Sequence, residues 1–536
     1  MAISSASRRA VLFGIGASGL VAGPAAAITT AQMFPVVETA QGRVRGLISG
    51  GISVFKGLRY GAETSGKNRF MPPKPPPSWK GVRDAFAYGQ ISPQVTSDRR
   101  RDYADLIMFD IQPGGMGEDC LVLNLWTPKA ERGGKRPVLL HVHGGGYYGG
   151  SGNSPGFDGE KLARFGDVVT ISINHRLGAL GYMGLLGLNP PPEFASAGTA
   201  GLQDIAAALR WVRDNIDAFG GDPNRVLLYG QSGGGSKTSM LMAMPEAKGL
   251  FHRAGIMSGA ALRATSPEDA AKSAEALIRQ LGVRKGDFRA LQAVPFLDIL
   301  SAQATLEEGE RSRGEAPRSF SPVLDAHLPR HPFDPDAPAV SADVPVVIGT
   351  TLDERAYRLT NFDLDEPGLR KFVQERAGPR TDQAMALYRG EDPKATPFVL
   401  QARVDSDLTF HPSYFTLQER KAAQAKAPIW SYLWKAPSPA YGGRYGAPHG
   451  VDVGMSLHDI RGGLNGPSAE QLALADQIAS AWVSFAATGD PNNKRLPQWP
   501  AFEAKRRATM IFDKPTHVEN DPRKAIREFW ANKSTP

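Results

Sequence analysis

Apolar and polar positions follow two different periods along this chain, and the two periods alternate. Residues 138–142, 168–173, 226–229 and 344–348 are short runs dominated by β-branched and aliphatic side chains. Such runs, without polar alternation, are typical of strands buried on both faces of a parallel sheet. Residues 200–219 instead repeat their apolar side chains every three or four positions, which predicts an amphipathic helix directly before the strand at 226–229.

Weaker patterns extend this alternation over the rest of the chain. Residues 36–54 alternate apolar and polar positions around glycines, which predicts small antiparallel strands and turns. Further strands are predicted at 255–257 and 429–433, and further helices at 236–244, 267–281, 368–377, 415–425 and 469–488. Strands that alternate with helices predict an α/β fold, with a central, mostly parallel twisted sheet flanked by helices.

The first 27 residues have the features of an export signal. Arg8 and Arg9 open the segment, residues 11–22 are apolar, and Ala25-Ala26-Ala27 offers a cleavage site. The pattern resembles a twin-arginine signal and predicts a periplasmic or secreted mature protein. An uncleaved membrane anchor is the alternative, but no later run approaches the length of a transmembrane helix.

Composition narrows the class of protein. With 536 residues the chain is long enough for a large core. Its formal net charge is +8, but no basic stripe is interleaved with aromatic residues, so nucleic-acid binding is not expected.

The strand at 226–229 runs directly into Gly230-Gln231-Ser232-Gly233-Gly234. A G-x-S-x-G segment between a strand and a helix is typical of a nucleophile elbow, where the serine stands on a strained turn and the flanking glycines leave room. We therefore predict that Ser232 is a nucleophile at the carboxyl edge of the sheet, with the Gly233 N–H facing the attacked group. Since the chain holds 59 glycines, the alternative is a glycine turn with an incidental serine.

A second glycine segment, His143-Gly144-Gly145-Gly146, follows the strand at 138–142. Consecutive glycines let the main chain approach a ligand and direct N–H groups toward it. With the Gly233 N–H, two of them could bind the oxyanion of a tetrahedral intermediate, as in lipases and esterases. His141 and His143 alternate along the strand as a metal pair would, but no third ligand is evident, and neither a metal nor a cofactor is expected.

Together these segments resemble the type-B carboxylesterases of the α/β-hydrolase superfamily, which include the cholinesterases and the bacterial para-nitrobenzyl esterases. The resemblance is carried by 118–121, 143–146, 174–178, 211–234 and 482–500. It implies an α/β-hydrolase domain over 28–536, with helical insertions near 262–330 and 355–425 above the active-site edge. It also implies a carboxylesterase that hydrolyses a small-molecule ester through an acyl-enzyme intermediate.

Carried over position by position, the resemblance completes a catalytic triad around Ser232. The acid corresponds to Glu354, in the segment 349–354, and the base to His449, in the segment 448–452. The chain order Ser, Glu, His is that of the superfamily. The resemblance also assigns oxyanion donors at Gly145, Gly146 and Gly233, and supporting residues at Ser258, Gln231 and Asp452.

Four positions depart from the family pattern. Gln231 stands where Glu is usual, which removes a negative charge and argues against a cationic substrate. Gly233 replaces the usual Ala but keeps the same N–H. Cys120 occupies a disulfide position whose expected partner is Ser92, and since it is the only cysteine no intrachain disulfide can form. Arg355 replaces the Gly that usually follows the acid, so the local turn is expected to differ.

Alternatives remain beside this interpretation. Without the resemblance, the alternative for Glu354 is a surface acid beside Asp353, and the alternative for His449 is a loop histidine, one of ten histidines in the chain. A non-catalytic, cholinesterase-like binding protein is a second interpretation, although such proteins generally lose the nucleophile. Hydrolysis of amides or carbamates by the same triad is a third. The acyl and alcohol preferences and the oligomeric state do not follow from the sequence.

Overall fold

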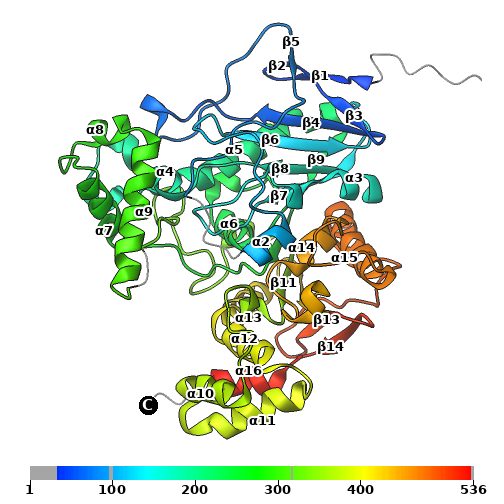
Figure 1. Ribbon diagram of the computed structural model, residues 1–536. Coiled ribbons are helices and arrows are strands. Elements are labelled where there is room, and N and C mark those ends of the chain that lie inside the picture. Colours follow the sequence, from blue (N-terminus) through cyan, green and yellow to red (C-terminus); the bar gives the residue numbers. More distant parts are fainter. Residues whose placement is uncertain (1–32, 96–100, 316–317, 533–536) are drawn as a thin grey trace, which may run out of the picture.

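The computed structural model of the protein describes residues 33–95, 101–315 and 318–532 (Figure 1). The predicted export signal, residues 1–27, lies outside this part of the chain. Within it, no helix has both the length and the apolar character needed to span a membrane.

A mixed sheet of eleven strands organises the fold, in the spatial order β14-β13-β12-β11-β10-β9-β7-β8-β6-β4-β3. Its strands are β3 (Leu47–Ser49), β4 (Ile52–Arg59), β6 (Val122–Thr127), β7 (Arg136–Val142), β8 (Val169–Ile173), β9 (Gly221–Gln231), β10 (Arg253–Met257), β11 (Val346–Thr351), β12 (Ile429–Trp434), β13 (Ala508–Phe512) and β14 (His517–Asn520). The strands from β8 to β13 in this order run parallel to one another, and β14, β6, β4 and β3 are antiparallel to their neighbours. The predicted, mostly parallel sheet is confirmed.

A second, small sheet near the amino terminus joins β1 (Val36–Thr39), β2 (Gly42–Arg45) and β5 (Val82–Asp84). The β1–β2 pair is antiparallel, as is the β3–β4 pair of the main sheet. The alternating pattern of residues 36–54 therefore predicted these strands correctly.

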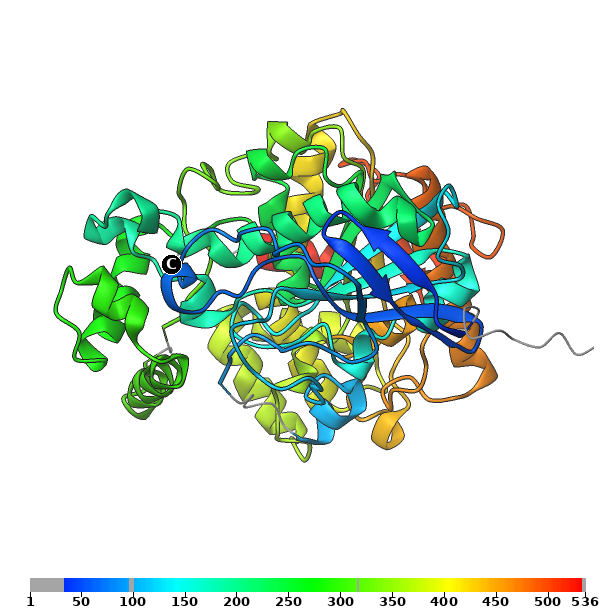
Figure 2. The ribbon, with the colours of Figure 1, turned by 90° about the horizontal axis from the view of Figure 1, so that it is seen from above.

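Helices cover both faces of the main sheet (Figures 1 and 2). They are α2 (Arg101–Ile107), α3 (Glu160–Gly166), α4 (Gly178–Gly181), α5 (Ala200–Asn215), α6 (Gly233–Leu241), α7 (Pro267–Gln280), α8 (Phe288–Ala293), α9 (Phe296–Ser312), α10 (Glu366–Ala377), α11 (Thr381–Glu391), α12 (Pro397–Thr409), α13 (His411–Ala423), α14 (Val451–Ser456), α15 (Ala469–Thr488) and α16 (Lys524–Ala531). Figure 1 shows α7 to α9 gathered at the left of the view, and α10 to α13 beside α16 at the bottom. The limits of the helical insertions stay a prediction.

Alternate side chains of the central strands supply two separate cores. Leu140 and Leu228 pack with apolar residues of α5 and α6, whereas Leu139, Leu227 and Tyr229 pack with those of α3 and α15 on the other face. Because successive strand residues point to opposite faces, a strand buried on both sides must be apolar throughout. This is why the uninterrupted apolar runs predicted the strands.

Helix α6 begins at Gly233, three residues before the predicted start at 236. Glycine disfavours helix formation, so the propensity of residues 233–235 argued for a later start. Close packing requires glycine in this first turn in spite of its low helix propensity, because a Cβ atom on Gly234 would lie only 2.0 Å from the carbonyl oxygen of Val142.

Cys120 is buried and free. Its thiol lies beside the Ser92 hydroxyl, which stands at the expected partner position and also accepts a hydrogen bond from the main-chain N–H of Leu177 at 3.1 Å. Burial raises the pKa of the thiol to about 12. Packing and hydrogen bonding hold this loop without the covalent bridge that the resemblance implies at this position.

Candidate active site

Ser232 stands on a sharp turn between β9 and α6. Its backbone has φ 57° and ψ −124°, a combination that residues with a side chain rarely adopt. A Cβ atom on Gly230 would lie 2.6 Å from the main-chain carbon of Gly234, so the turn requires glycine at that position. The turn therefore has the geometry of a nucleophile elbow, and an incidental serine in a flexible glycine turn does not explain it.

The two glycine segments meet beside this turn. A Cβ atom on Gly233 would lie 2.5 Å from the nitrogen of Gly146, so the usual Ala would force the two segments apart. Gly145 and Gly146 have φ values of 94° and 62°. Among the described residues, no group accepts a hydrogen bond from the N–H of Gly145, Gly146 or Gly233. Three unpaired donors thus lie together next to Ser232.

His449 and Glu354 form a buried pair. His449 Nδ1 lies 2.5 Å from Glu354 Oε2, and the other carboxylate oxygen accepts hydrogen bonds from the Thr350 hydroxyl at 2.6 Å and the Thr351 N–H at 2.8 Å. Glu354 is completely buried, so it is not a surface acid. Burial alone would raise its pKa, but the charge of His449 and the hydrogen bonds it receives lower the pKa to about 2. The carboxylate is therefore ionised and accepts the Nδ1 proton.

Gln231 contacts the other nitrogen of the imidazole. Its side-chain nitrogen lies 3.0 Å from His449 Nε2, and its side chain is buried. With the Nδ1 proton directed at Glu354, the Nε2 of a neutral imidazole accepts from the amide. This contact joins the elbow to His449, because Gln231 directly precedes Ser232. Among the described residues the Ser232 hydroxyl makes no hydrogen bond, as is common before substrate binds.

The other expected supporting residues lie on two sides of Glu354. Ser258, with a φ of 49°, is close enough to Glu354 to lower the pKa of its carboxyl, although its hydroxyl has no hydrogen-bond partner in the described parts of the chain. Asp452 accepts a hydrogen bond from the Tyr432 hydroxyl at 2.6 Å. Burial raises the pKa of Asp452 to about 6. Asp452 therefore supports the loop through Tyr432, and its carboxyl group ionises less readily than an exposed one.

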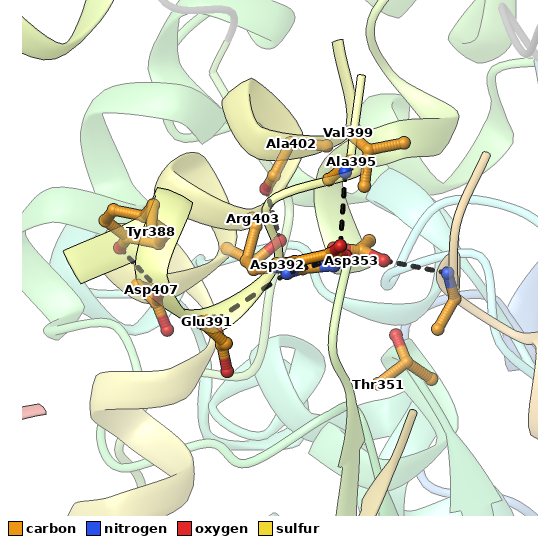
Figure 3. Close-up of polar contacts among 12 residues, drawn as sticks. Thr351, Asp353, Tyr388, Glu391, Asp392, Ala395, Val399, Ala402, Arg403 and Asp407 are labelled. Atoms are coloured by element: carbon orange, nitrogen blue, oxygen red, sulfur yellow. Dashed lines mark hydrogen bonds and ion pairs between the residues drawn. The ribbon is translucent and has the colours of Figure 1, made fainter. Parts of the chain in front are cut away.

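Asp353 points toward Arg403 of α12, as Figure 3 shows. One of its oxygens accepts from Arg403 Nε at 2.9 Å, and the other accepts from the main-chain N–H of Ala447 at 2.8 Å. The Asp353 N–H in turn donates to the Ala447 carbonyl at 3.0 Å. Asp353 therefore fastens the loop that carries Glu354 to the loop that carries His449. The sequence analysis did not assign it this part, because Arg403 lies 50 residues away along the chain.

The turn after Glu354 is short, and whether it differs from the family's turn, as the substitution at Arg355 predicts, stays a prediction. Residues Glu354–Tyr357 form one turn of 3₁₀ helix, and Arg355 pairs with Asp405 of α12 at 2.7 Å. The ring of Tyr357 then stacks on His449, with a centroid distance of 5.0 Å. This turn therefore helps to fix the imidazole plane.

A cavity of about 260 Å³ opens beside Ser232. Its wall includes Gly146 and Gly233 on one side, and Phe410 and Ser413, at the junction of α12 and α13, on the other. His449 and Glu354 do not line it. The cavity therefore lies on the side of Ser232 where Gly146 and Gly233 stand, and one of its wall residues, Phe410, packs against the imidazole with ring centroids 5.2 Å apart.

The histidines at the carboxyl end of β7 have aromatic neighbours. His141 packs between Phe157 and Tyr229, and burial lowers its pKa to about 3. His143 stacks on His175 with ring centroids 4.6 Å apart. In the described ranges no group of three or more His, Cys, Asp or Glu side chains is arranged to hold a metal ion.

The order of the sheet, with the elbow after β9 and the acid after β11, defines an α/β-hydrolase. The family model described as the carboxylesterase family matches residues 34–530. The chain belongs to this family and is a carboxylic ester hydrolase. The resemblance noted in the sequence is thereby confirmed, and the non-catalytic interpretation is wrong.

Characterised relatives match over nearly their full length. Para-nitrobenzyl esterase of Bacillus subtilis (strain 168) is 34% identical over 513 residues, which cover 92% of this chain and 98% of that protein. Phenmedipham hydrolase of Pseudarthrobacter oxydans is 33% identical, with coverages of 91% and 97%. The crystal structure of a Geobacillus stearothermophilus carboxylesterase matches with a TM-score of 0.77 and 34% identity, covering 92% of this chain and 99% of that one.

Proposed function

We propose that this enzyme hydrolyses carboxylic esters through a covalent acyl-enzyme, with Ser232 as nucleophile, His449 as general base and acid, and Glu354 as the group that orients the imidazole. The observation that carries the proposal is the buried His449–Glu354 hydrogen bond, which Gln231 joins to the strained turn of Ser232. No metal or cofactor takes part in it.

In the first half of the reaction, Ser232 Oγ attacks the carbonyl carbon of the ester while its proton passes to His449 Nε2. The carbonyl oxygen becomes an oxyanion, which the N–H groups of Gly145, Gly146 and Gly233 stabilise. When the intermediate collapses, the C–O bond to the alcohol breaks and the alcohol leaves with the proton from Nε2. Glu354 remains ionised throughout and stabilises the imidazolium.

In the second half, a water molecule gives a proton to Nε2 and its oxygen attacks the acyl carbon. The same donors hold the second oxyanion, and the bond to Ser232 Oγ breaks as Oγ recovers the proton. Carboxylic acid and free enzyme result. For Nε2 to accept the proton of Ser232, the Gln231 amide must release its hydrogen bond to Nε2. The ester displaces the amide when it binds beside Ser232.

The position of the cavity supports an assignment of the two halves of the substrate. The alcohol must leave close to His449, since it takes the proton from Nε2, so the acyl group occupies the cavity on the oxyanion side. Its 260 Å³ lies below the 300–1,000 Å³ typical of pockets for drug-sized ligands, which favours a short acyl chain. Ser236, Ser258 and Ser413 in its wall add hydroxyl groups that an acyl chain with a polar substituent would contact.

The test is hydrolysis of para-nitrophenyl esters of graded acyl length by the purified enzyme and by Ser232→Ala. We expect the highest kcat/KM for short acyl chains and a loss of about 10⁶-fold in kcat in the variant. A matched ester and amide pair with the same acyl group separates esterase from amidase preference. Appreciable turnover by Ser232→Ala would refute the proposed nucleophile.

We also propose export of the enzyme through the twin-arginine route, on the strength of Arg8, Arg9 and the alanines at 25–27. Amino-terminal sequencing of protein recovered from the periplasm or medium should find cleavage after these alanines. Replacing both arginines with lysine should leave the precursor inside the cell. Normal export of that variant would contradict the proposal.

A further inference from the structure

Lys237 is a completely buried lysine one turn into α6. Its ammonium donates a hydrogen bond to the main-chain carbonyl of His143 at 3.3 Å and lies 5.8 Å from the centre of the Tyr147 ring. Over the described ranges no carboxylate forms an ion pair with it, and burial lowers its pKa to about 7. An amine buried without a counter-ion is costly to the fold, so a role for Lys237 in its surroundings is expected.

The two contacts of Lys237 lie on either side of the oxyanion glycines. His143 immediately precedes Gly144–Gly146, and Tyr147 immediately follows them. Two other carbonyls of the segment are held by the main chain, Gly145 by the Gly149 N–H at 3.0 Å and Tyr147 by the Gly178 N–H at 2.8 Å. Lys237 supplies the corresponding anchor at the start of the segment.

This anchor matters because glycine peptides have wide conformational freedom. The directions of the Gly145 and Gly146 N–H bonds depend on how the peptides around them are held. A displacement of about 1 Å in such a group is enough to lower a rate by about 100-fold. A donor that fixes the His143 carbonyl therefore limits how far these N–H bonds can turn.

The same side chain ties this segment to the nucleophile. Helix α6 starts directly after Ser232 and carries Lys237 five residues later. At its first turn the helix lies against the glycine segment with no side chain between them, since a Cβ atom on Gly234 would lie 3.1 Å from the His143 carbonyl oxygen. The lysine then bridges from the next turn to that same oxygen.

We infer that Lys237 is a positioning residue, which holds the N–H groups of Gly145 and Gly146 in place relative to Ser232 Oγ. The inference rests on the proposed function, because it assigns a support to the proposed oxyanion site. Lys237 does not line the cavity beside Ser232, so it acts through His143 and not through contact with substrate. Both the ammonium and the neutral amine can donate to the carbonyl.

The test compares Lys237→Met, which keeps an unbranched side chain as far as the Cε position and removes the donor, with Thr238→Val. Thr238 is a neighbouring buried residue of α6 whose hydroxyl donates to the Gly234 carbonyl at 3.0 Å, within the helix. Each variant is assayed for kcat, KM and inhibition by a trifluoromethyl ketone, which adds to a serine hydroxyl and forms a tetrahedral oxyanion.

For Lys237→Met we expect kcat to fall about 10- to 100-fold with KM changed less than about threefold, and the inhibition constant of the ketone to rise by the same factor as kcat falls. Thr238→Val should leave the inhibition constant unchanged. If Lys237 had a structural role alone, the variant would have a lower melting temperature and a lower folded fraction, but the folded protein would bind the ketone with unchanged affinity.

A folded Lys237→Met enzyme with wild-type kcat and wild-type ketone affinity overturns the inference. If this variant does not fold, Lys237→Gln takes its place. It keeps an N–H donor but ends one atom short, so kcat and ketone affinity should fall together by a smaller factor, and no change in either overturns the inference. A wild-type enzyme that neither turns over esters nor binds the ketone would instead refute the proposed function.

Discussion

Replacing Glu354 with glutamine should reverse the hydrogen bond that orients His449. In the native site the Thr350 hydroxyl and the Thr351 N–H both donate to the same carboxylate oxygen, at 2.6 and 2.8 Å. In Glu354→Gln the amide oxygen must stay with these two donors, since the Thr351 N–H cannot accept. The amide nitrogen then faces His449 Nδ1 and donates to it.

That reversal moves the imidazole proton to Nε2. An imidazole protonated at Nε2 cannot take the proton of Ser232, so the base is present in the wrong tautomer. In a serine protease the equivalent change of acid to amide lowers kcat about 10⁴-fold, close to 5.5 kcal/mol of transition-state stabilisation. We expect a loss of similar size here, with little change in KM and a folded protein.

Asp353→Asn is the matched control. It alters the neighbouring buried acid and breaks the pair with Arg403, which should cost about 3–5 kcal/mol of stability. It leaves the Glu354–His449 contact in place, so kcat per folded molecule should stay within about tenfold of wild type. The assay is hydrolysis of para-nitrophenyl acetate, with the folded fraction measured by circular dichroism. Equal losses of kcat in the two variants, or wild-type kcat in Glu354→Gln, would refute the reasoning.

Three further outcomes follow from the same site and its surroundings. The folded-state pKa of Glu354, about 2, lies below its unfolded value, so the stabilisation that its carboxylate gives the fold is complete above about pH 4.5 and is lost as pH falls toward 2. In urea unfolding, the stability advantage of wild type over Glu354→Gln should therefore shrink by about 2 kcal/mol between pH 5 and pH 3. A constant difference would contradict this. Gln231→Glu places a carboxylate near His449 Nε2 and favours the protonated imidazole, so the acidic limb of kcat/KM against pH should move up by about 1 to 3 pH units. An unmoved limb would show that the contact between residue 231 and His449 does not persist in the working enzyme. Because burial raises the pKa of Cys120, a disulfide reagent at pH 8 should label it only after denaturation, whereas rapid labelling of the native enzyme would contradict its placement.

The parts of the structure that could be predicted from the sequence are those that a pattern of neighbouring residues determines. The elbow is one, because the strained turn at Ser232 demands glycine two positions before and after it. The doubly buried strands are another, because each strand feeds two cores. The positions of Glu354 and His449 came from the family resemblance, since neither has a local pattern that distinguishes it from a loop residue.

Contacts between distant segments could not be predicted in the same way. The bond between Gln231 and His449 joins residues 218 positions apart, and that between Lys237 and His143 joins residues 94 apart. One signal for Lys237 was available. It is the only charged residue in Gly233–Leu241, a segment of small and apolar residues where no acid stands three or four positions away to pair with it. A lone lysine in such a helix has no solvated face to occupy.

The fastening of the acid loop to the base loop through Asp353 has a mechanical consequence. Two main-chain strands clipped together by reciprocal hydrogen bonds travel as one body, so Glu354 and His449 keep their spacing while that body shifts. Ser232 is joined to this unit by the pairing of β9, β10 and β11 in the sheet and by the contact of Gln231 with His449. Release of the Gln231 amide therefore changes the surroundings of Nε2, while the imidazole keeps its orientation toward Glu354.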